Sequence, residues 1–133
     1  MRRFLQRKLW RDGAIDLVEM DGYRVCWRRL SDEEFDRALK EKLVEEMLEV
    51  KFSQNRDELL EEMADVLTVM DALMDLHQIS DSQLSNMKNQ KNKERGNFSG
   101  RKYVEYSDHP SGSRGERYCL NDPDKYMEIP IPS

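Results

Sequence analysis

Four carboxylates recur with the same spacing in two neighbouring segments of the chain. Glu46 and Glu49 stand three positions apart in KLVEEMLEV. Glu62 and Asp65 stand three positions apart in LLEEMADVL. At about 100° per residue, Glu46 shares a helix face with the apolar residues of its segment, and Glu62 does the same in the second segment. A carboxylate on an apolar face loses solvation, so each segment needs a partner for its charge.

Packing of the two faces against each other would bring all four acids to one interface. Their repulsion and loss of solvation would raise their pKa values or open the helix pair unless a cation meets them. The donors are all carboxylate oxygens without Cys or His nearby in sequence, which fits Mg²⁺, or alternatively Mn²⁺, better than zinc or copper. Mg²⁺ leaves positions for water and phosphate oxygens, so the pattern indicates phosphate chemistry. The alternative is a set of salt bridges, for which Lys42 lies on the acidic face.

Two long helices are expected to position these acids. Ser31 and Glu34 have capping-box spacing and open a helical pattern over about residues 32–52. Asn55 and Glu58 repeat that spacing before the second pattern, whose apolar residues again fall on one face. The connection between the two is short, which favours an antiparallel helix hairpin.

The flanking segments carry weaker signals. Residues 12–20 can form a short helix, after which a DG turn leads into the extended stretch YRVCWRRL. Ser80 and Gln83 mark a third helix start, running to about residue 94 and followed by a glycine-containing loop. From about residue 106 the tail holds all four prolines and little periodicity, so irregular structure is expected there.

Length and composition set the architecture. A chain of 133 residues suits one domain, here residues 1–105, followed by the tail 106–133. Charged residues make up 37% of the chain, so its apolar residues must be concentrated in stripes. The prediction is an all-α fold in which the hairpin completes a four-helix-bundle-type core by forming a homodimer or a higher homo-oligomer.

Charge and cysteine usage exclude several classes of protein. A net charge of -5 argues against a dedicated binder of nucleic acid or anionic membrane. No apolar run approaches about 18 residues, so no membrane insertion is expected. Cys26 and Cys119 are far apart and form no CxxC motif, which fits a protein of the reducing cytoplasm.

The acidic pattern also resembles a known one, EExxE followed after about a dozen residues by ExxD. It is similar to that of the all-α nucleoside triphosphate pyrophosphohydrolases, the MazG-like superfamily, which includes dimeric dUTPases and phosphoribosyl-ATP pyrophosphohydrolase. The stretch KLWRDGAIDLVEMDG resembles the opening of one MazG-like subgroup, and KNKERGNFSGRKYV resembles its basic closing segment. The resemblance covers roughly residues 8–104. Gly13 and Ala14 depart from it, since a Lys-Ile-Pro-like run is usual there.

The resemblance implies Mg²⁺-dependent hydrolysis of a nucleotide between its α and β phosphates, releasing a monophosphate and pyrophosphate. The carried-over metal ligands are Glu46, Glu49, Glu62 and Asp65. Glu45 would orient or deprotonate the attacking water, or else be a surface acid. Only the resemblance places Lys8, Arg11 and Asp12 at the edge of the site.

A triphosphate also needs cationic contacts beyond the metal. Lys42 is one candidate, and the basic segment supplies the others, Lys91, Lys93, Arg95 and Arg101. Each of the latter can equally be a solvated residue near a helix end. The aromatic candidates for stacking on a base, or for the core, are Trp10, Tyr23, Trp27 and Phe98.

The substrate stays open among a standard or modified nucleoside triphosphate, dUTP or dCTP, and phosphoribosyl-ATP. A different class of function is also open, a non-catalytic helical oligomerisation and interaction module. In that case the acids make interchain salt bridges, and no divalent ion is required. Nucleic-acid binding through residues 88–102 is the third alternative, and it predicts affinity that falls steeply with salt.

Overall fold

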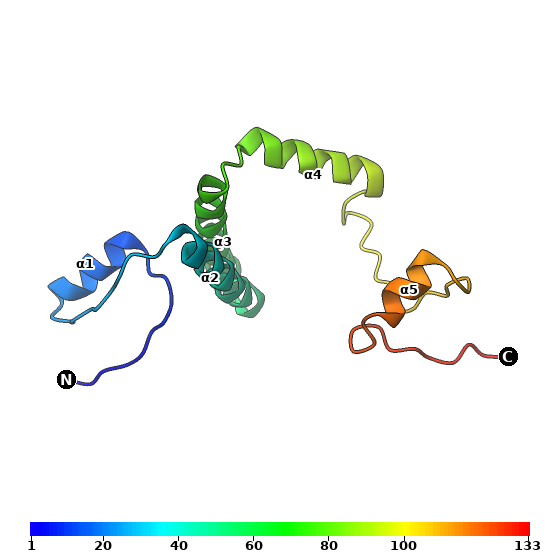
Figure 1. Ribbon diagram of the computed structural model, residues 1–133, viewed down its shortest axis with the longest axis horizontal. Coiled ribbons are helices and arrows are strands. Elements are labelled where there is room, and N and C mark those ends of the chain that lie inside the picture. Colours follow the sequence, from blue (N-terminus) through cyan, green and yellow to red (C-terminus); the bar gives the residue numbers. More distant parts are fainter. The chain divides into compact units, whose positions relative to one another are not determined.

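The computed structural model describes all 133 residues, and it contains five helices and no strand. The predicted all-α class is confirmed. The chain divides into two compact units, Met1–Lys93 and Glu94–Ser133, and each is described separately. The helices, labelled in Figure 1, are α1 (Asp12–Met20), α2 (Asp32–Phe52), α3 (Arg56–Leu76), α4 (Asp81–Arg95) and α5 (Arg114–Leu120).

The two long helices begin at the predicted caps. At the start of α2, the Glu34 N–H donates to Ser31 Oγ, and the Ser31 N–H donates to the Glu34 carboxylate, which completes the capping box. At the start of α3, the Glu58 N–H donates to Asn55 Oδ1 over 2.9 Å. The Glu58 carboxylate accepts from the N–H of Gln54 instead of that of Asn55, so the second box closes one residue earlier than predicted.

Helices α2 and α3 form the antiparallel hairpin, and they are the one pair of helices in contact (Figure 1). A short connection joins the end of α2 to the start of α3. His77 connects the end of α3 to the beginning of α2. It caps the C-terminus of α3, and its Nε2 lies 2.5 Å from Oδ1 of Asp36 in the first turns of α2. This hairpin is the scaffold on which the acidic residues lie.

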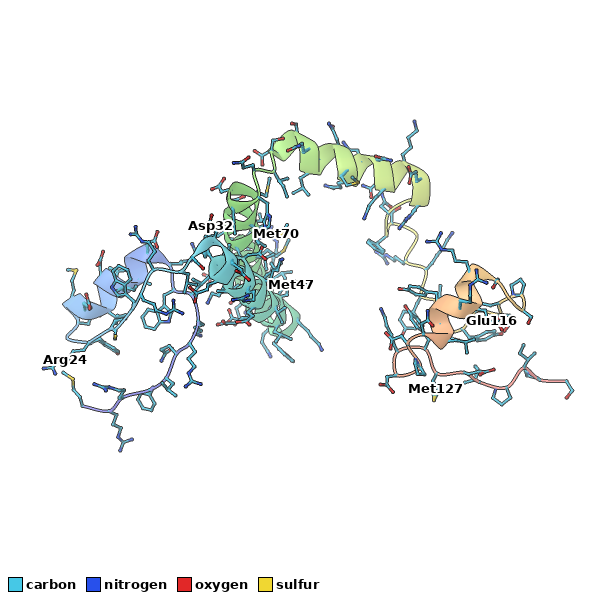
Figure 2. All side chains as sticks on the ribbon, viewed as in Figure 1. Arg24, Asp32, Met47, Met70, Glu116 and Met127 are labelled. Atoms are coloured by element: carbon cyan, nitrogen blue, oxygen red, sulfur yellow. The ribbon has the colours of Figure 1, made fainter.

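The core of the hairpin is small. The buried apolar side chains are Leu39, Val69 and Met74, and the one buried charged side chain is Glu46, with 7% of its surface exposed. Other apolar residues of the hairpin face outward, including Met47, which is 54% exposed (Figure 2). The hairpin therefore carries more apolar side chains than it buries.

The helices on either side of the hairpin follow the predictions. Helix α1 covers the predicted residues 12–20, and Gly22 takes up a positive φ of 89° in the turn after it. Residues 23–30 form neither helix nor strand. Ser80 and Gln83 form two reciprocal hydrogen bonds at the start of α4. The Gln83 N–H donates to Ser80 Oγ, and the Ser80 N–H donates to Gln83 Oε1. Helix α4 buries none of its residues, and none of the five helices is long and apolar enough to cross a membrane.

The second unit corrects one prediction. The tail from residue 106 was expected to be irregular throughout, but Arg114–Leu120 forms α5. Its start is capped by Ser113, whose Oγ accepts from the Glu116 N–H, while the Glu116 carboxylate accepts from the Gly112 N–H. Hydrogen bonds at its N-terminus thus stabilise a helix of only seven residues. The functional boundary near residue 105 stays a prediction.

Candidate metal centre

The four predicted acids lie together on the hairpin. One carboxylate oxygen from each of Glu46, Glu49, Glu62 and Asp65 lies within 4.8 Å of the others. Helix α2 supplies the first two and α3 supplies the last two. Glu46 is buried, Glu62 and Asp65 are half-buried, and Glu49 is exposed. The acids meet because each pair occupies the same helix face as the apolar residues that pack α2 on α3.

Two oxygens of this cluster have no donor. Glu46 Oε2 and Glu62 Oε2 are buried and accept no hydrogen bond from the protein. Burial raises the pKa of Glu46, although Lys42 opposes this effect. The pKa of Glu62 rises to about 7, chiefly through a hydrogen bond with Glu49 that requires a shared proton, and then through burial and repulsion from the other acids. Without a cation, the cluster therefore retains a proton near neutral pH.

Lys42 offsets part of the negative charge within α2, whereas the salt-bridge interpretation predicted pairs across the helix interface. Its Nζ lies 3.4 Å from Oε1 of Glu46 and 3.4 Å from Oε1 of Glu45. It contacts neither of the two oxygens that lack a donor. The salt bridges of Lys42 thus leave two buried oxygens of the cluster without a partner, which a bound cation would supply.

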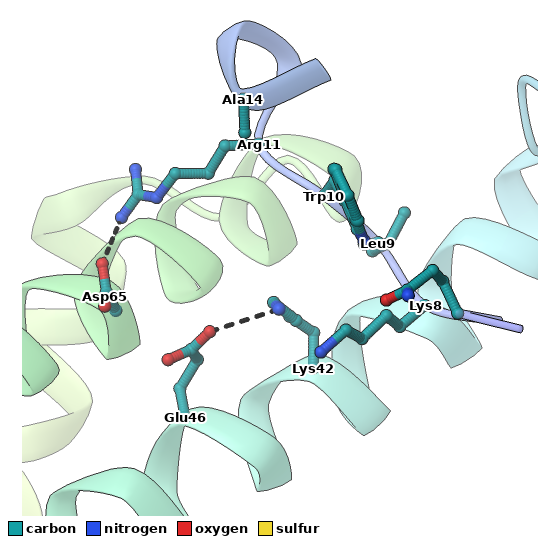
Figure 3. A pocket seen from close by; sticks show the side chains of 9 residues that line it. Lys8, Leu9, Trp10, Arg11, Ala14, Lys42, Glu46 and Asp65 are labelled. Carbon is teal, nitrogen blue, oxygen red and sulfur yellow. Dashed lines mark hydrogen bonds and ion pairs between the residues drawn. The ribbon is translucent and has the colours of Figure 1, made fainter. Parts of the chain in front are cut away.

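The N-terminal segment adds two more cations at the edge of the cluster (Figure 3). Lys8 Nζ lies 2.9 Å from Glu45 Oε1, and Arg11 Nη2 lies 2.5 Å from Asp65 Oδ1. The same Arg11 nitrogen donates to Thr68 Oγ1 over 3.3 Å. The hydrogen bond from Lys8 lowers the pKa of Glu45, and Lys42 acts in the same direction. Glu45 is therefore ionised at neutral pH.

An open pocket of about 290 Å³ lies between the N-terminal segment and the acids. It is lined by Gln6, Lys8, Leu9, Trp10, Arg11, Ala14, Lys42, Glu46 and Asp65. Trp10 is the one aromatic residue in this lining. The other predicted stacking candidates lie outside it and are exposed, namely Tyr23, Trp27 and Phe98.

The predicted basic segment lies elsewhere on the chain. Lys91 and Lys93 are exposed on α4, and α4 makes no helix contact with the hairpin. Arg95 ends α4 and Arg101 has a positive φ of 52°, both within the second unit. Neither Lys91 nor Lys93 forms an ion pair with the acidic cluster. Their role in holding phosphate stays a prediction.

Asp12 and Thr68 complete the account of the site. Asp12 opens α1 and lies in its first turn, where it complements the helix dipole. Thr68 was not predicted, although it follows Asp65 by three positions and so lies on the same side of α3. The prediction considered charged groups, so it did not include the Thr68 hydroxyl, which accepts a hydrogen bond from Arg11.

The donor set fits a hard divalent cation. Four carboxylates converge from two helices, two of their buried oxygens lack donors, and no sulfur or imidazole ligand is present in the cluster. The cations and the open pocket beside the cluster suit an anionic ligand that would share the site with a bound metal. No protein-family model, curated protein or solved structure matches this chain.

Proposed function

We propose that the protein is a Mg²⁺-dependent nucleotide pyrophosphohydrolase that hydrolyses its substrate between the α and β phosphates. The observation that carries the proposal is the convergence of four carboxylates within 4.8 Å, with two buried oxygens that lack donors. The order of the three motifs, which resembles that of MazG-like enzymes, supports the same reaction. Mn²⁺ is an alternative metal, because it accepts the same oxygen ligands.

The four acids would hold the metal. When bound, the cation supplies charge neutralisation at phosphate oxygens and lowers the pKa of a coordinated water. The chain's own residues orient the reaction around it. Glu45 lies at the edge of the cluster, held by Lys8 at 2.9 Å and Lys42 at 3.4 Å, and its ionised carboxylate accepts the proton of the attacking water. No covalent intermediate is required.

Cationic side chains bind the phosphates in this proposal. Lys42 is best placed, since it is 19% exposed and already lies beside two acids of the site. Lys91, Lys93, Arg95 and Arg101, which are exposed on α4 and the loop after it, stay candidates for the outer phosphates from the sequence alone. The substrate class is a nucleoside triphosphate or a related nucleotide, with phosphoribosyl-ATP as the main rival.

The apolar surface of the hairpin supports assembly into a homodimer or a higher oligomer. An apolar groove of about 280 Å³ is lined by Met47, Val50, Met63, Val66 and Leu67. Because the hairpin buries so few apolar residues, a second hairpin from another copy would complete its core. The same groove would serve the alternative, a non-catalytic interaction module. In that alternative, cationic side chains of another copy would pair with the two oxygens that lack donors, and no divalent ion would be required.

The test is pyrophosphate release from a panel of nucleoside triphosphates and phosphoribosyl-ATP, with and without Mg²⁺. The wild type is compared with Glu46→Gln and Asp65→Asn, and Glu61→Gln serves as the control, because Glu61 is an exposed acid of α3 outside the cluster. Mg²⁺-dependent release that is lost in both cluster variants and kept in the control supports the proposal. Absence of turnover with every substrate rejects it and favours the interaction module.

A further inference from the structure

The segment from Lys8 to Ala14 spans the acidic cluster from one helix of the hairpin to the other. Lys8 pairs with Glu45 on α2. Arg11 pairs with Asp65 on α3 (Figure 3). The partners lie 37 and 54 residues away in sequence. Because Lys8 and Arg11 hold the segment to both helices, the side chains between them, Leu9 and Trp10, lie against the site. Both are half-buried there.

The pocket under this segment has two chemically different walls. The N-terminal segment contributes the apolar side chains of Leu9, Trp10 and Ala14 beside the polar ones of Gln6, Lys8 and Arg11. The hairpin contributes the charged side chains of Lys42, Glu46 and Asp65. A volume of about 290 Å³ lies just below the range for small-molecule sites, about 300–1,000 Å³. A ligand with a flat apolar group joined to an anionic group is complementary to these walls once the acids hold a metal.

Arg11 retains free donors while it is held in place. A guanidinium carries five N–H donors, and here only Nη2 is engaged, by Asp65 Oδ1 and Thr68 Oγ1. The Thr68 hydroxyl in turn donates to the carbonyl of Ala64 over 3.0 Å. A lone pair of Thr68 Oγ1 therefore remains available to accept from Arg11. The Arg11 side chain is 57% exposed. Its remaining N–H groups are open to a phosphate adjacent to the metal ligand Asp65.

We propose that this segment is the nucleotide-binding side of the centre, with the base stacked on Trp10 and a phosphate held by Arg11. Thr68 acts as a positioning residue for Arg11. The inference rests on the proposed function and adds to it the recognition of the base, for which no other aromatic residue lines the pocket. Because every base has a π-face, stacking on Trp10 favours a site that accepts several bases.

Tryptophan fluorescence tests the proposal independently of turnover. The chain has two tryptophans, and Trp27 is 62% exposed and outside the pocket, so Trp27→Phe leaves Trp10 as the sole reporter. The probes are the α,β-methylene analogues of ATP, GTP, CTP and UTP, each with Mg²⁺. We expect them to quench Trp10 saturably. Inorganic tripolyphosphate should displace them without quenching, and the matched variant Trp10→Phe, which retains Trp27, should not respond.

Affinities separate the two roles. Trp10→Ala should weaken analogue binding by roughly 5- to 150-fold, the range for loss of one stacked base, and leave tripolyphosphate binding unchanged. Trp10→Phe should restore most of that loss. Arg11→Gln should weaken the analogues and tripolyphosphate alike by about tenfold or more. Calorimetry should show that neither variant weakens the binding of Mg²⁺ alone.

The proposal is overturned if no analogue quenches Trp10, if tripolyphosphate quenches it equally, or if Trp10→Ala binds the analogues as the wild type does. Pyrophosphate release with an unchanged KM in Trp10→Ala would reject the subsite and leave the proposed hydrolysis standing. Quenching by the analogues without pyrophosphate release from any triphosphate would support the subsite and reject the hydrolysis.

Discussion

Replacement of Glu46 by glutamine should stabilise the metal-free protein. Glu46 is the most buried acid of the cluster, and its Oε2 accepts no hydrogen bond. Burial and the charges of Glu49 and Asp65 act against its ionisation, and Lys42 acts for it. An amide has nearly the same shape as the carboxylate and carries no charge, so the substitution removes the repulsion and leaves the packing intact.

The size of the effect follows from the distances. Glu46 is repelled by the charges of Glu49 and Asp65, whose carboxylate oxygens lie within 4.8 Å of its own. At an effective dielectric constant of about 20, each of these two repulsions is roughly 3.5 kcal/mol. Attraction between Glu46 and Lys42, whose Nζ lies 3.4 Å from Oε1, offsets roughly 4.9 kcal/mol of this repulsion. Glu46→Gln should therefore raise the free energy of unfolding without metal by about 2 kcal/mol.

Urea denaturation in EDTA and in excess Mg²⁺ measures this change. Glu45→Gln is the matched control, because Glu45 is the adjacent acid and is held favourably by Lys8 and Lys42, so its loss should destabilise the protein slightly. In Mg²⁺ at 100 times its Kd the wild type should gain about 2.7 kcal/mol, and Glu46→Gln should lose most of that gain. A metal-free Glu46→Gln protein that is less stable than the wild type would refute the reasoning.

Three further predictions concern pH, metal affinity and helix capping. The pKa of Glu62 is raised from 4.5 to about 7 in the folded protein, so metal-free stability should fall as pH rises from about 4.5 to about 7, and urea midpoints at pH 5 and pH 8 should differ less in Glu62→Gln. Asp65→Asn should weaken Mg²⁺ binding in calorimetry by at least about tenfold, whereas Glu61→Gln should not. Ser31→Ala should lower the free energy of unfolding by about 1 kcal/mol, and an unchanged urea midpoint would contradict the capping role.

The hairpin and its acids could be predicted because their determinants are local. Capping residues at Ser31 and Asn55 fix where the helices start, and spacing then fixes the face on which each acid lies. Glu46 and Glu62 occupy equivalent phases on two neighbouring helices, so antiparallel packing brings them together without further information.

The rest of the site depends on contacts that no local pattern encodes. Lys8 and Arg11 reach acids 37 and 54 residues away, and only the resemblance placed them near the site. Helix α5 was missed because Gly115 lies within its seven residues and lowers helix propensity, although Ser113 and Glu116 had capping-box spacing. Lys91 and Lys93 were assigned to the site from their charge and from the resemblance of their segment, and no helix contact of α4 with the hairpin tests that assignment.

The most direct measurement of the central claim is the position of the oxygen that enters during hydrolysis. Turnover of a nucleoside triphosphate in ¹⁸O-labelled water with Mg²⁺ should place the label in the monophosphate and leave the pyrophosphate unlabelled. That result corresponds to attack at the α phosphorus beside the four carboxylates of the hairpin. Label in the pyrophosphate, or release of inorganic phosphate in its place, would contradict the assigned reaction.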